Sequence, residues 1–380
     1  RRVVLRAVSW LLAVVGGVGL LGSAGLLGVY VHYTNAIQHV SVAGLRTSTT
    51  AAVATPEENI LLVGSDSRDG ATAADLARAR TADDGGGTNT DTILLVHLPA
   101  GNGAPTMISF PRDSYLTVPG WPGRHRINSV YAHFGGRGTD GKGQGPSALV
   151  QTVERLTGLS VDHYVEVNFF GFMDLTDALG GVEVCLKAPA KDAFSGIDLP
   201  AGLNHLDGPT ALQFVRQRHG LANEDLDRIK RQQYFGQRVA TTLRSSNLLT
   251  NPVKLNSVLS AALKHLYLDQ GLGADGLRSL ALRIRNIDLT KLNQQTVPIA
   301  GPYLSPYGED VLLVDYSALT ALVAPLKPGY TPPPATATAT ASATATATPS
   351  QPATTAPARS GSVTPSASPP ATLGGIPCTY

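Results

Sequence analysis

The feature that most constrains the fold is a series of short apolar runs, each about the length of a β-strand. They lie at 59–64, 91–98, 106–110, 164–167 and 182–186, are rich in Val, Ile and Leu, and are bounded by Gly, Pro or Asp. Runs of this length and composition predict strands. Because most of them are too uniformly apolar to have one solvent-exposed face, both faces of the sheet that they form are expected to be covered.

Stretches with helical periodicity separate these runs. Residues 145–158 and 168–181 repeat apolar side chains at helical spacing and end in glycine, which predicts a helix in each. Later helices are expected at about 224–246, 252–267 and 273–286, closing strands at 294–299 and 309–315, and a last helix at 316–326. Strands that alternate with helices indicate one α/β domain, which we assign to residues 56–328.

The N-terminus predicts a membrane anchor. Residues 7–31 are 25 residues without a charged side chain, and at about 1.5 Å per residue a helix of that length crosses a ~30 Å hydrocarbon core. Arg1, Arg2 and Arg6 precede it, so residues 1–6 are expected in the cytoplasm and everything after a transmembrane helix at 7–33 outside. A cleaved signal peptide is the alternative, but its apolar core spans only ~7–15 residues. Residues 34–55 would then be a linker.

The C-terminal segment has a different composition. Residues 329–380 are dominated by Pro, Ala, Thr, Ser and Gly, which predicts a disordered, extended tail stiffened by proline. The net charge of +2 is too small to indicate nucleic acid binding. Cys185 and Cys378 lie in different segments and suggest neither a disulfide framework nor a zinc site; whether they meet stays open.

Cationic side chains gather between residues 214 and 233, namely Arg216, Arg218, Arg228, Lys230 and Arg231. On a helix, Arg228, Arg231 and Gln232 share one face. A solvated helix face, or salt bridges to Glu224, Asp225 and Asp227, would be the structural explanations. No acidic residue occurs between Arg228 and Ala240, so the pattern favours an anionic partner. Guanidinium groups match pairs of phosphate oxygens, so a phosphate would suit this pattern as the anionic partner.

Three acidic residues and one arginine lie at the ends of the predicted strands. Asp66 follows the run at 59–64, Arg112 and Asp113 follow 106–110, and Asp91 begins the run at 91–98. Ligands of open α/β sheets collect at the carboxyl ends of strands, although an Asp near Gly and Ser is more often a turn residue. A pyrophosphate held by arginines would bring Mg²⁺, and Asp66 and Asp91 are the predicted carboxylates for it. P-loop, kinase and dinucleotide motifs are absent from the sequence.

Several motifs together resemble one protein family. "NILLVGSDSR", "TDTILLVHL", "ISFPRDSYL", "RINSVYAHFG", "FFGFMDLTDALGGVEV", "LNHLDGPTALQFVRQRH" and "DLDRIKRQQ" occur in the order and spacing of LytR–CpsA–Psr proteins. The resemblance covers residues 59–240 and continues more loosely through the closing strands. It implies a three-layer α-β-α sandwich with a mixed central sheet, outside the membrane. It also implies a phosphotransferase that moves a phosphoglycan from a polyprenyl-pyrophosphate carrier to a peptidoglycan sugar hydroxyl.

The resemblance also implies roles for individual residues. Asp66 and Asp91 look like the magnesium ligands and Arg112 like the catalytic arginine, with Asp91 or Asp113 as the general base. The residues expected to bind pyrophosphate are Arg68, Arg216, Arg218, Arg228, Arg231 and Gln232. Those expected to line a lipid site are Val165, Val167, Phe169 and Phe172, for which an ordinary core position is an equal explanation.

Two departures from the family pattern bear on these roles. Asp227 stands where the family usually has glycine, and its charge would either weaken phosphate binding or point to solvent. An insert at 69–90 separates Asp66 from Asp91 and would form a lid. Two other functions stay open: a non-catalytic binding protein for lipid-linked polymer, which would not need metal, and a polyprenyl pyrophosphatase, which would use water as the acceptor.

Overall fold

The computed structural model describes residues 38–46, 56–67, 72–80, 89–101, 103–138, 143–222, 224–245, 266–273, 276–277, 279–280, 283–284, 287, 291–327, 372–373 and 375–379. No helix within these ranges has the length and apolar character needed to cross a bilayer. The predicted cytoplasmic residues 1–6 and transmembrane helix 7–33 lie outside the described residues.

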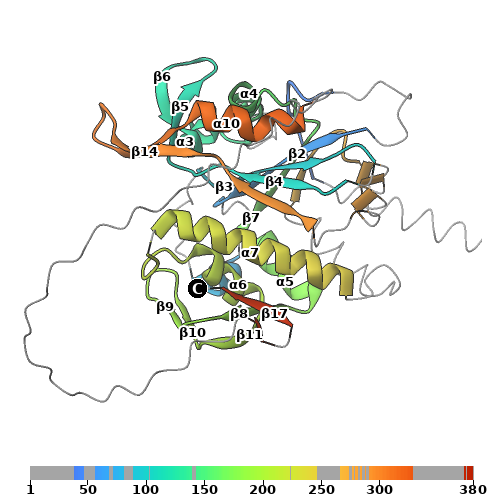
Figure 1. The fold of residues 1–380 in the computed structure, drawn as a ribbon, viewed down its shortest axis with the longest axis vertical. Helices are drawn as coiled ribbons and strands as arrows, with labels where there is room; N and C mark the ends of the chain where they lie inside the picture. Colours follow the sequence, from blue (N-terminus) through green and yellow to red (C-terminus); the bar gives the residue numbers. More distant parts are fainter. Residues whose placement is uncertain are drawn as a thin grey trace, which may run out of the picture.

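A seven-stranded sheet crosses the middle of the molecule (Figure 1). Its strand order is β1 (Gln38–Val40), β12 (Leu266–Asp269), β7 (His163–Asn168), β2 (Glu58–Ser65), β3 (Thr90–Leu98), β4 (Thr106–Ser109) and β13 (Asn293–Thr296). The sheet is mixed, because β2 pairs in parallel with β7 and antiparallel with β3. The predicted mixed α/β fold is thereby confirmed, as are the strands expected at 59–64, 91–98, 106–110 and 164–167.

One side of this sheet carries a tightly packed layer, at the top of Figure 1. It consists of α3 (Ile127–His133), α4 (Gly145–Thr157), α10 (Tyr316–Val323), the short helix η2 (Ala324–Leu326) and a sheet ordered β14 (Ile299–Leu304), β15 (Asp310–Val314), β5 (Ser114–Val118) and β6 (Trp121–Arg126). The core between this layer and the central sheet contains fully buried aliphatic side chains, among them Leu61, Val63, Leu95 and Leu149.

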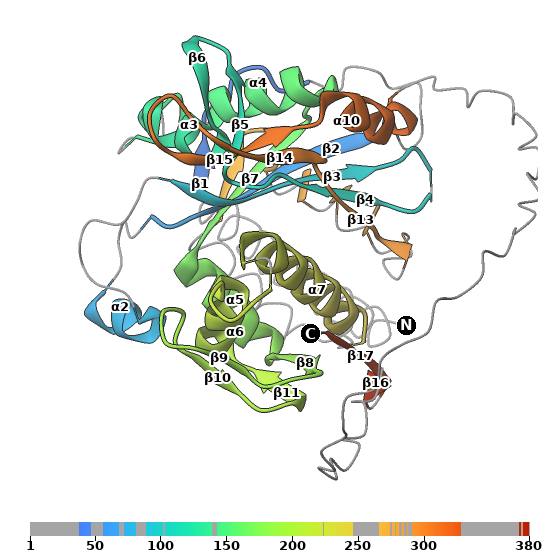
Figure 2. The ribbon, with the colours of Figure 1, turned by 60° about the vertical axis from the view of Figure 1, so that its left-hand side comes forward.

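The other side carries a second layer with its own core (Figures 1 and 2). Its helices are α2 (Ala73–Ala79), α5 (Phe169–Leu179), α6 (Gly208–Arg216) and α7 (Glu224–Ser245). Its strands are β8 (Val182–Leu186), β9 (Ala190–Asp192), β10 (Ile197–Leu199), β11 (Gly202–Leu206), β16 (Thr372–Leu373) and β17 (Ile376–Thr379). The strand predicted at 182–186 therefore exists, but it belongs to this layer's sheet instead of the central one.

The two faces of the central sheet are buried to different degrees. Leu61, Val63 and Leu95 are fully buried on the face toward α3 and α4. On the opposite face Ile60 and Leu98 are buried as well. Five other apolar side chains on that face are only half-buried, and we call these five the half-buried sheet face: Leu62, Leu94, Val96, Val165 and Val167. The strand register makes them neighbours, because Leu62 lies opposite both Leu94 and Val165. Complete cover of both faces, as the sequence predicts, holds only for the first.

The domain begins before the predicted boundary at residue 56. Strand β1 lies within the predicted linker and pairs in parallel with β12. Arg46 donates hydrogen bonds of 2.6 and 2.8 Å to the two carboxylate oxygens of Asp162. The described part of 34–55 is thus an edge of the domain. The helix predicted at 252–267 is wrong at its end, because residues 266 and 267 begin β12.

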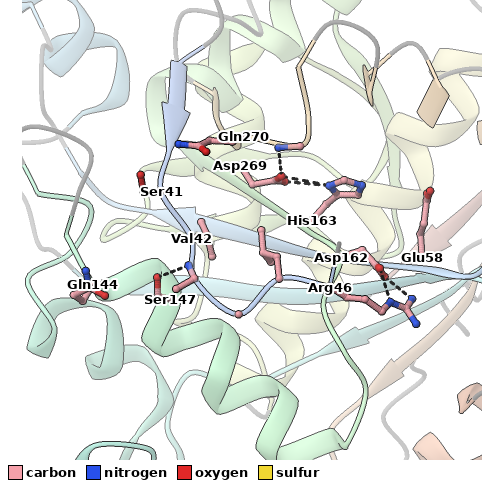
Figure 3. A pocket seen from close by; sticks show the side chains of 14 residues that line it. Ser41, Val42, Arg46, Glu58, Gln144, Ser147, Asp162, His163, Asp269 and Gln270 are labelled. Carbon is pink, nitrogen blue, oxygen red and sulfur yellow. Dashed lines mark hydrogen bonds and ion pairs between the residues drawn. The ribbon is translucent and has the colours of Figure 1, made fainter. Parts of the chain in front are cut away.

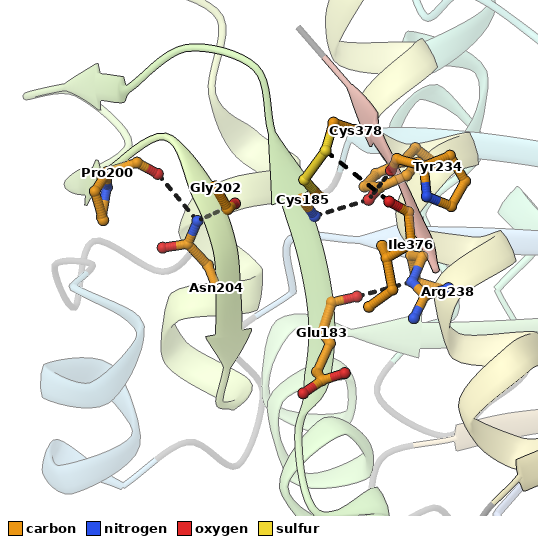
Figure 4. The surroundings of a disulfide bond; sticks show 10 residues. Glu183, Cys185, Pro200, Gly202, Asn204, Tyr234, Arg238, Ile376 and Cys378 are labelled. Carbon is orange, nitrogen blue, oxygen red and sulfur yellow. Dashed lines mark hydrogen bonds between the residues drawn. A yellow bond between two sulfur atoms is a disulfide. The ribbon is translucent and has the colours of Figure 1, made fainter. Parts of the chain in front are cut away.

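The predicted disordered tail is wrong at its C-terminal end. Strand β17 pairs in parallel with β8, and Cys378 lies opposite Cys185, to which it is joined by a disulfide (Figure 4). The Tyr234 hydroxyl, on α7, accepts a 2.9 Å hydrogen bond from the Cys185 amide and donates a 2.8 Å bond to the Pro377 carbonyl. Composition describes the average behaviour of a segment and misses one covalent link near its end. The remainder of the predicted tail lies outside the described residues.

Candidate active site

The ends of two antiparallel strands bring Asp66 and Asp91 together. β2 ends at Ser65, which lies opposite Thr90 at the start of β3, and the register shifts between Gly64 and Ser65. Asp66 follows Ser65 directly and Asp91 follows Thr90. The residues on either side of the insert at 69–90 therefore lie at the same end of the β2–β3 pair, so the insert does not separate the two acids.

Part of this insert is helix α2, which packs beside α5 in the lower layer. Its N-terminus has a capping box in which Thr72 and Asp75 satisfy each other's backbone amides. Arg78 forms ion pairs of 3.1 Å with Asp174 and 2.8 Å with Asp177 on α5. The described part of the predicted lid is thus fixed to the lower layer.

Arg112 belongs to a row of alternating charges. Its guanidinium lies 2.9 Å from Asp91 and 3.4 Å from Asp113. Arg126 continues the row, at 3.6 Å from Asp113 and 2.6 Å from Glu309. We call Asp91, Arg112, Asp113, Arg126 and Glu309 the charged row.

The two candidate bases differ in their surroundings. Asp113 lies between two guanidinium groups, and its side chain is 18 % exposed, against 35 % for Asp91. A turn fixes the segment, because the Ser114 amide donates to the Pro111 carbonyl at 2.9 Å. Asp91 is therefore the better candidate to accept a proton, and Asp113 holds the arginines.

The end of α6 presents two arginines on one side. The helix stops at Arg216, and Gln217 is extended with φ −57° and ψ 132°. Arg216 and Arg218 are therefore half-buried on the same side, and Gln217 between them is buried on the other. The Arg216 guanidinium lies 4.9 Å from the centre of the Phe169 ring.

Two basic residues of α7 are buried. Arg228 and Arg231 are only 4 % and 3 % exposed, which excludes a solvated helix face. Arg231 donates a 2.6 Å hydrogen bond to Gln217 Oε1 and lies 4.9 Å over the Phe214 ring. Gln232 makes a longer contact, 3.4 Å to the Val215 carbonyl. We call Arg216, Arg218, Arg228 and Arg231 the arginine cluster.

Asp227 does not point to solvent, contrary to one of the two expectations for it. It is buried, and its carboxylate lies 2.9 Å from the Lys230 ammonium. An opposite charge at that distance offsets much of the carboxylate's charge, so its effect on a neighbouring anion is weakened.

Gln233 connects the arginine cluster to the central sheet. Its amide lies 2.9 Å from the Ser109 hydroxyl, 3.2 Å from the Gln295 carbonyl and 3.2 Å from the Thr296 hydroxyl. Ser109 ends β4, three residues before Arg112. The helix that carries Arg228 and Arg231 therefore docks at the end of the sheet where Arg112 lies. The sequence analysis missed Gln217 and Gln233. Gln217 could have been found, because it lies between Arg216 and Arg218 in an extended segment and must therefore face the side opposite to them.

A buried polar network supports the same sheet end, and it too was missed. Glu166 on β7 is fully buried. It accepts hydrogen bonds from Ser65 (3.0 Å), Tyr131 (2.8 Å), Arg137 (2.8 Å) and Tyr164 (3.1 Å). Burial, together with the nearby Glu166 charge, raises the pKa of Tyr164 well above its ordinary value. The network fixes Ser65, the residue before Asp66.

The predicted lipid-site residues fall into two groups. Val165 and Val167 belong to the half-buried sheet face. Phe169 lies beneath Arg216, and Phe172 packs in the lower layer with its ring 5.3 Å from that of Phe235. Apolar surface therefore continues from the sheet to the arginine cluster. Arg68, predicted to bind pyrophosphate, lies outside the described residues.

A cavity of about 610 Å³ lies at the ends of β2 and β7 that are farther from Asp66 (Figure 3). Its charged groups are matched with each other: Arg46 with Asp162, and His163 with Asp269 at 3.2 Å. Burial lowers the pKa of His163, but the hydrogen bond and charge of Asp269 outweigh burial and raise it overall. Its one arginine is paired with Asp162, and Glu58 and Asp269 add further negative charge. This lining suits a phosphate less well than the arginine cluster does, so the candidate site is the other end of the sheet.

Comparison with known proteins identifies the family. The model of the LytR_cpsA_psr family matches residues 29–327. The chain belongs to the LytR_cpsA_psr family. Among LytR_cpsA_psr relatives, the "Cell wall biosynthesis protein LcpA" of Corynebacterium glutamicum is 35 % identical over 342 residues, which is 84 % of this chain and 64 % of that protein.

A second relative has a more specific name. The "Polyisoprenyl-teichoic acid--peptidoglycan teichoic acid transferase TagU" of Oceanobacillus iheyensis is 36 % identical over 203 residues, 53 % of this chain and 56 % of that protein. The chain thus spans about three fifths of the length of these two relatives. The crystal structure of Bacillus subtilis TagV, with a TM-score of 0.56 at 24 % identity, covers 73 % of this chain and 99 % of its own, and shares the fold.

Proposed function

We propose that this protein transfers a phosphoglycan from a polyprenyl-pyrophosphate carrier to a sugar hydroxyl of peptidoglycan. One observation carries the proposal: the arginine cluster and Arg112 lie at the same end of the central sheet, and the half-buried sheet face leads away from them. A ligand that suits this surface has an anionic head joined to a long apolar chain. The name of the TagU relative describes a transferase that acts between such a lipid-linked polymer and peptidoglycan.

The arginine cluster would hold the pyrophosphate. Each guanidinium offers a planar pair of donors that matches two phosphate oxygens. Gln217 fixes Arg231, and the Phe169 ring supports Arg216, so little side-chain freedom would be lost on binding. The polyprenyl chain would lie against the half-buried sheet face, with Phe169 and Phe172 beside the head group.

The carboxylates at the sheet end fit a magnesium ion. Mg²⁺ in proteins takes one or two carboxylates together with phosphate oxygens and water. Asp66 and Asp91 supply two carboxylates from adjacent strand ends, and the described residues contain no cluster of three or more His, Cys, Asp or Glu that would form a complete cage. When bound there, Mg²⁺ would neutralise negative charge on the pyrophosphate.

The chain's own residues would then perform the transfer. The acceptor hydroxyl oxygen forms a bond to the phosphorus that carries the glycan, and the bond from that phosphorus to the bridging oxygen breaks, releasing polyprenyl phosphate. The carboxylate of the charged row that does not bind Mg²⁺ accepts the hydroxyl proton: Asp91 if the ion rests on Asp66, and otherwise Asp113. Arg112, held by Asp113, stabilises the negative charge that develops on the phosphoryl oxygens.

The proposal assigns this chemistry to the outer face of the membrane. Arg1, Arg2 and Arg6 flank the uncharged segment that follows them, and basic flanks stay on the cytoplasmic side. The protein would then cross the membrane once, and its domain would lie outside, facing the peptidoglycan.

Arg112→Ala tests the proposal. The assay follows transfer of labelled glycan from a purified lipid-linked donor to peptidoglycan, with Mg²⁺ in detergent. Loss of one well-placed charge donor lowers the rate about 10²- to 10³-fold. Arg155→Ala, an exposed arginine on α4, should leave the rate unchanged. A near wild-type rate in Arg112→Ala would contradict the catalytic assignment. Phosphate release without acceptor would instead indicate a pyrophosphatase, and donor binding without turnover a binding protein.

A further inference from the structure

A second, smaller cavity adjoins the charged row. Its volume is about 370 Å³, and it is lined by Trp121, His125, Arg126, Ser129, Tyr307 and Glu309. These residues come from β6, the start of α3 and the turn between β14 and β15. Figure 1 has the β5–β6 hairpin and the β14–β15 turn at the same side of the upper layer, the side on which α7 begins. We call this cavity the aromatic pocket.

The pocket is built on a stack of rings. The Trp121 ring lies parallel to those of His125 and His133, with 3.6 Å between ring centres in each case. On the far side of His125 stands Tyr307, with its ring centre 6.4 Å away and inclined by 15°. The His125 ring is also fixed by a 2.8 Å contact between Nε2 and the Pro122 carbonyl. Tyr307 is therefore the outer member of an otherwise immobilised stack.

Apolar surface is unusually exposed here. Tyr307 is 69 % exposed, and Tyr303 and Leu304 on the same hairpin are also exposed. The turn is nevertheless ordered by its own contacts: the Ser305 hydroxyl accepts from the amides of Tyr307 (3.3 Å) and Glu309 (3.1 Å). Exposed apolar side chains that are held in position, rimmed by polar groups, typically mark a binding site.

The charged row links the pocket to the reacting groups. Arg126 and Glu309 line the pocket and lie 2.6 Å apart. Arg126 also contacts Asp113, which contacts Arg112. A ligand in the pocket would thus lie at one end of a row whose other end is Asp91.

The charges of the row indicate the class of ligand. Three carboxylates, Asp91, Asp113 and Glu309, face two guanidinium groups in the contacts of the row. This excess of negative charge disfavours a second anionic ligand. A neutral ligand with an apolar face and several hydroxyl or amide groups suits both the tyrosine ring and the Arg126–Glu309 pair.

We propose that the aromatic pocket is the acceptor subsite, which binds a neutral sugar ring of the glycan chain next to the sugar that is attacked. The C–H face of the ring packs on Tyr307, and its hydroxyl and amide groups bond to Glu309 and Arg126. This inference rests on the proposed transfer function. It adds the site at which the acceptor is recognised, on the opposite side of Arg112 from Asp91.

Tyr307→Ala in the full chain tests the subsite. Loss of one aromatic contact should raise the KM for peptidoglycan about tenfold, with kcat and the KM for the lipid-linked donor within about twofold of wild type. Tyr316→Ala removes an exposed tyrosine of α10 that does not line the pocket, and should change neither constant. An unchanged acceptor KM in Tyr307→Ala, with the thermal stability preserved, would overturn the assignment.

Direct binding separates this inference from the proposed function. Trp121 is one of two tryptophans in the chain, the other being Trp10, so a Trp10→Phe variant reports on the pocket by fluorescence. The probe is a soluble tetrasaccharide of β-1,4-linked N-acetylglucosamine, used without donor. Binding that weakens about tenfold on addition of Tyr307→Ala supports the subsite even if no transfer occurs. Absence of binding to the Trp10→Phe protein would overturn it even if transfer occurs.

Discussion

Reduction of the Cys185–Cys378 disulfide should destabilise the domain strongly. The bond joins residues 193 positions apart, and closing a loop of that length removes chain entropy from the unfolded state. For 193 residues the loop-closure relation gives about 5 kcal/mol at 25 °C. Reduction changes no other side chain, so it isolates the cross-link. Because Tyr234 bonds both Cys185 and Pro377, loosening of β17 should also increase the mobility of α7.

Urea unfolding of the full chain, with and without a phosphine reductant, measures this effect. The far-ultraviolet circular dichroism signal should lose its helical component at a much lower urea concentration after reduction. The Cys185→Ser/Cys378→Ser double variant serves as the control, since its midpoint should not respond to the reductant. A difference in unfolding free energy below about 1 kcal/mol between oxidised and reduced wild type would refute the reasoning, because the loop-closure relation predicts several times more.

Three further predictions follow from the contacts of the site. Gln233→Ala should lower the free energy of unfolding by about 1–3 kcal/mol, because it leaves the buried Ser109 on β4 and two half-buried partners on β13 without this hydrogen bond; Gln232→Ala, which loses one 3.4 Å contact, should cost less in the same urea titration. Burial raises the pKa of Asp192, but hydrogen bonds from Phe194, Ser195 and Arg218 outweigh burial and lower it overall. The stability that Asp192 contributes is therefore present above the unfolded pKa of about 3.9 and lost as the pH falls through the lower folded value; melting curves of wild type and Asp192→Asn should differ from pH 7 to 5 and converge in acid. Chelation of divalent ions should abolish transfer, and Asp66→Asn should raise the Mg²⁺ concentration needed for half-maximal rate; an unchanged Mg²⁺ titration would contradict the ligand assignment.

The fold was predictable where one local pattern decided an element. The runs at 59–64 and 91–98 each contain four consecutive apolar residues or more, and they became β2 and β3. The helix at 145–158 ends at Gly158, whose φ of +69° is a conformation that favours glycine. The β5–β6 hairpin was not predicted, because β6 is an exposed strand with Pro122 and Gly123 in its sequence and shows no apolar alternation.

The site was predictable where charge gathered in the sequence. The arginine cluster and the Asp66–Asp91 pair came from residue type and position at strand ends. Single polar residues such as Gln233 and Glu166 form no local pattern, since their partners Ser109 and Ser65 are 124 and 101 positions away. The disulfide was missed for the same reason, as two isolated cysteines in unlike segments carry no information about register.

Helix α7 makes three contacts in three directions within four residues: Arg231 to Gln217, Gln233 to β4, and Tyr234 to β8 and β17. Each residue of a helix is rotated by about 100° from the one before it. Deletion or insertion of a single residue at Gln232 would therefore turn Gln233 and Tyr234 away from their partners while Arg231 kept its own. Among natural variants, the length of this segment should consequently vary less than its composition, and gaps in aligned sequences should fall outside it.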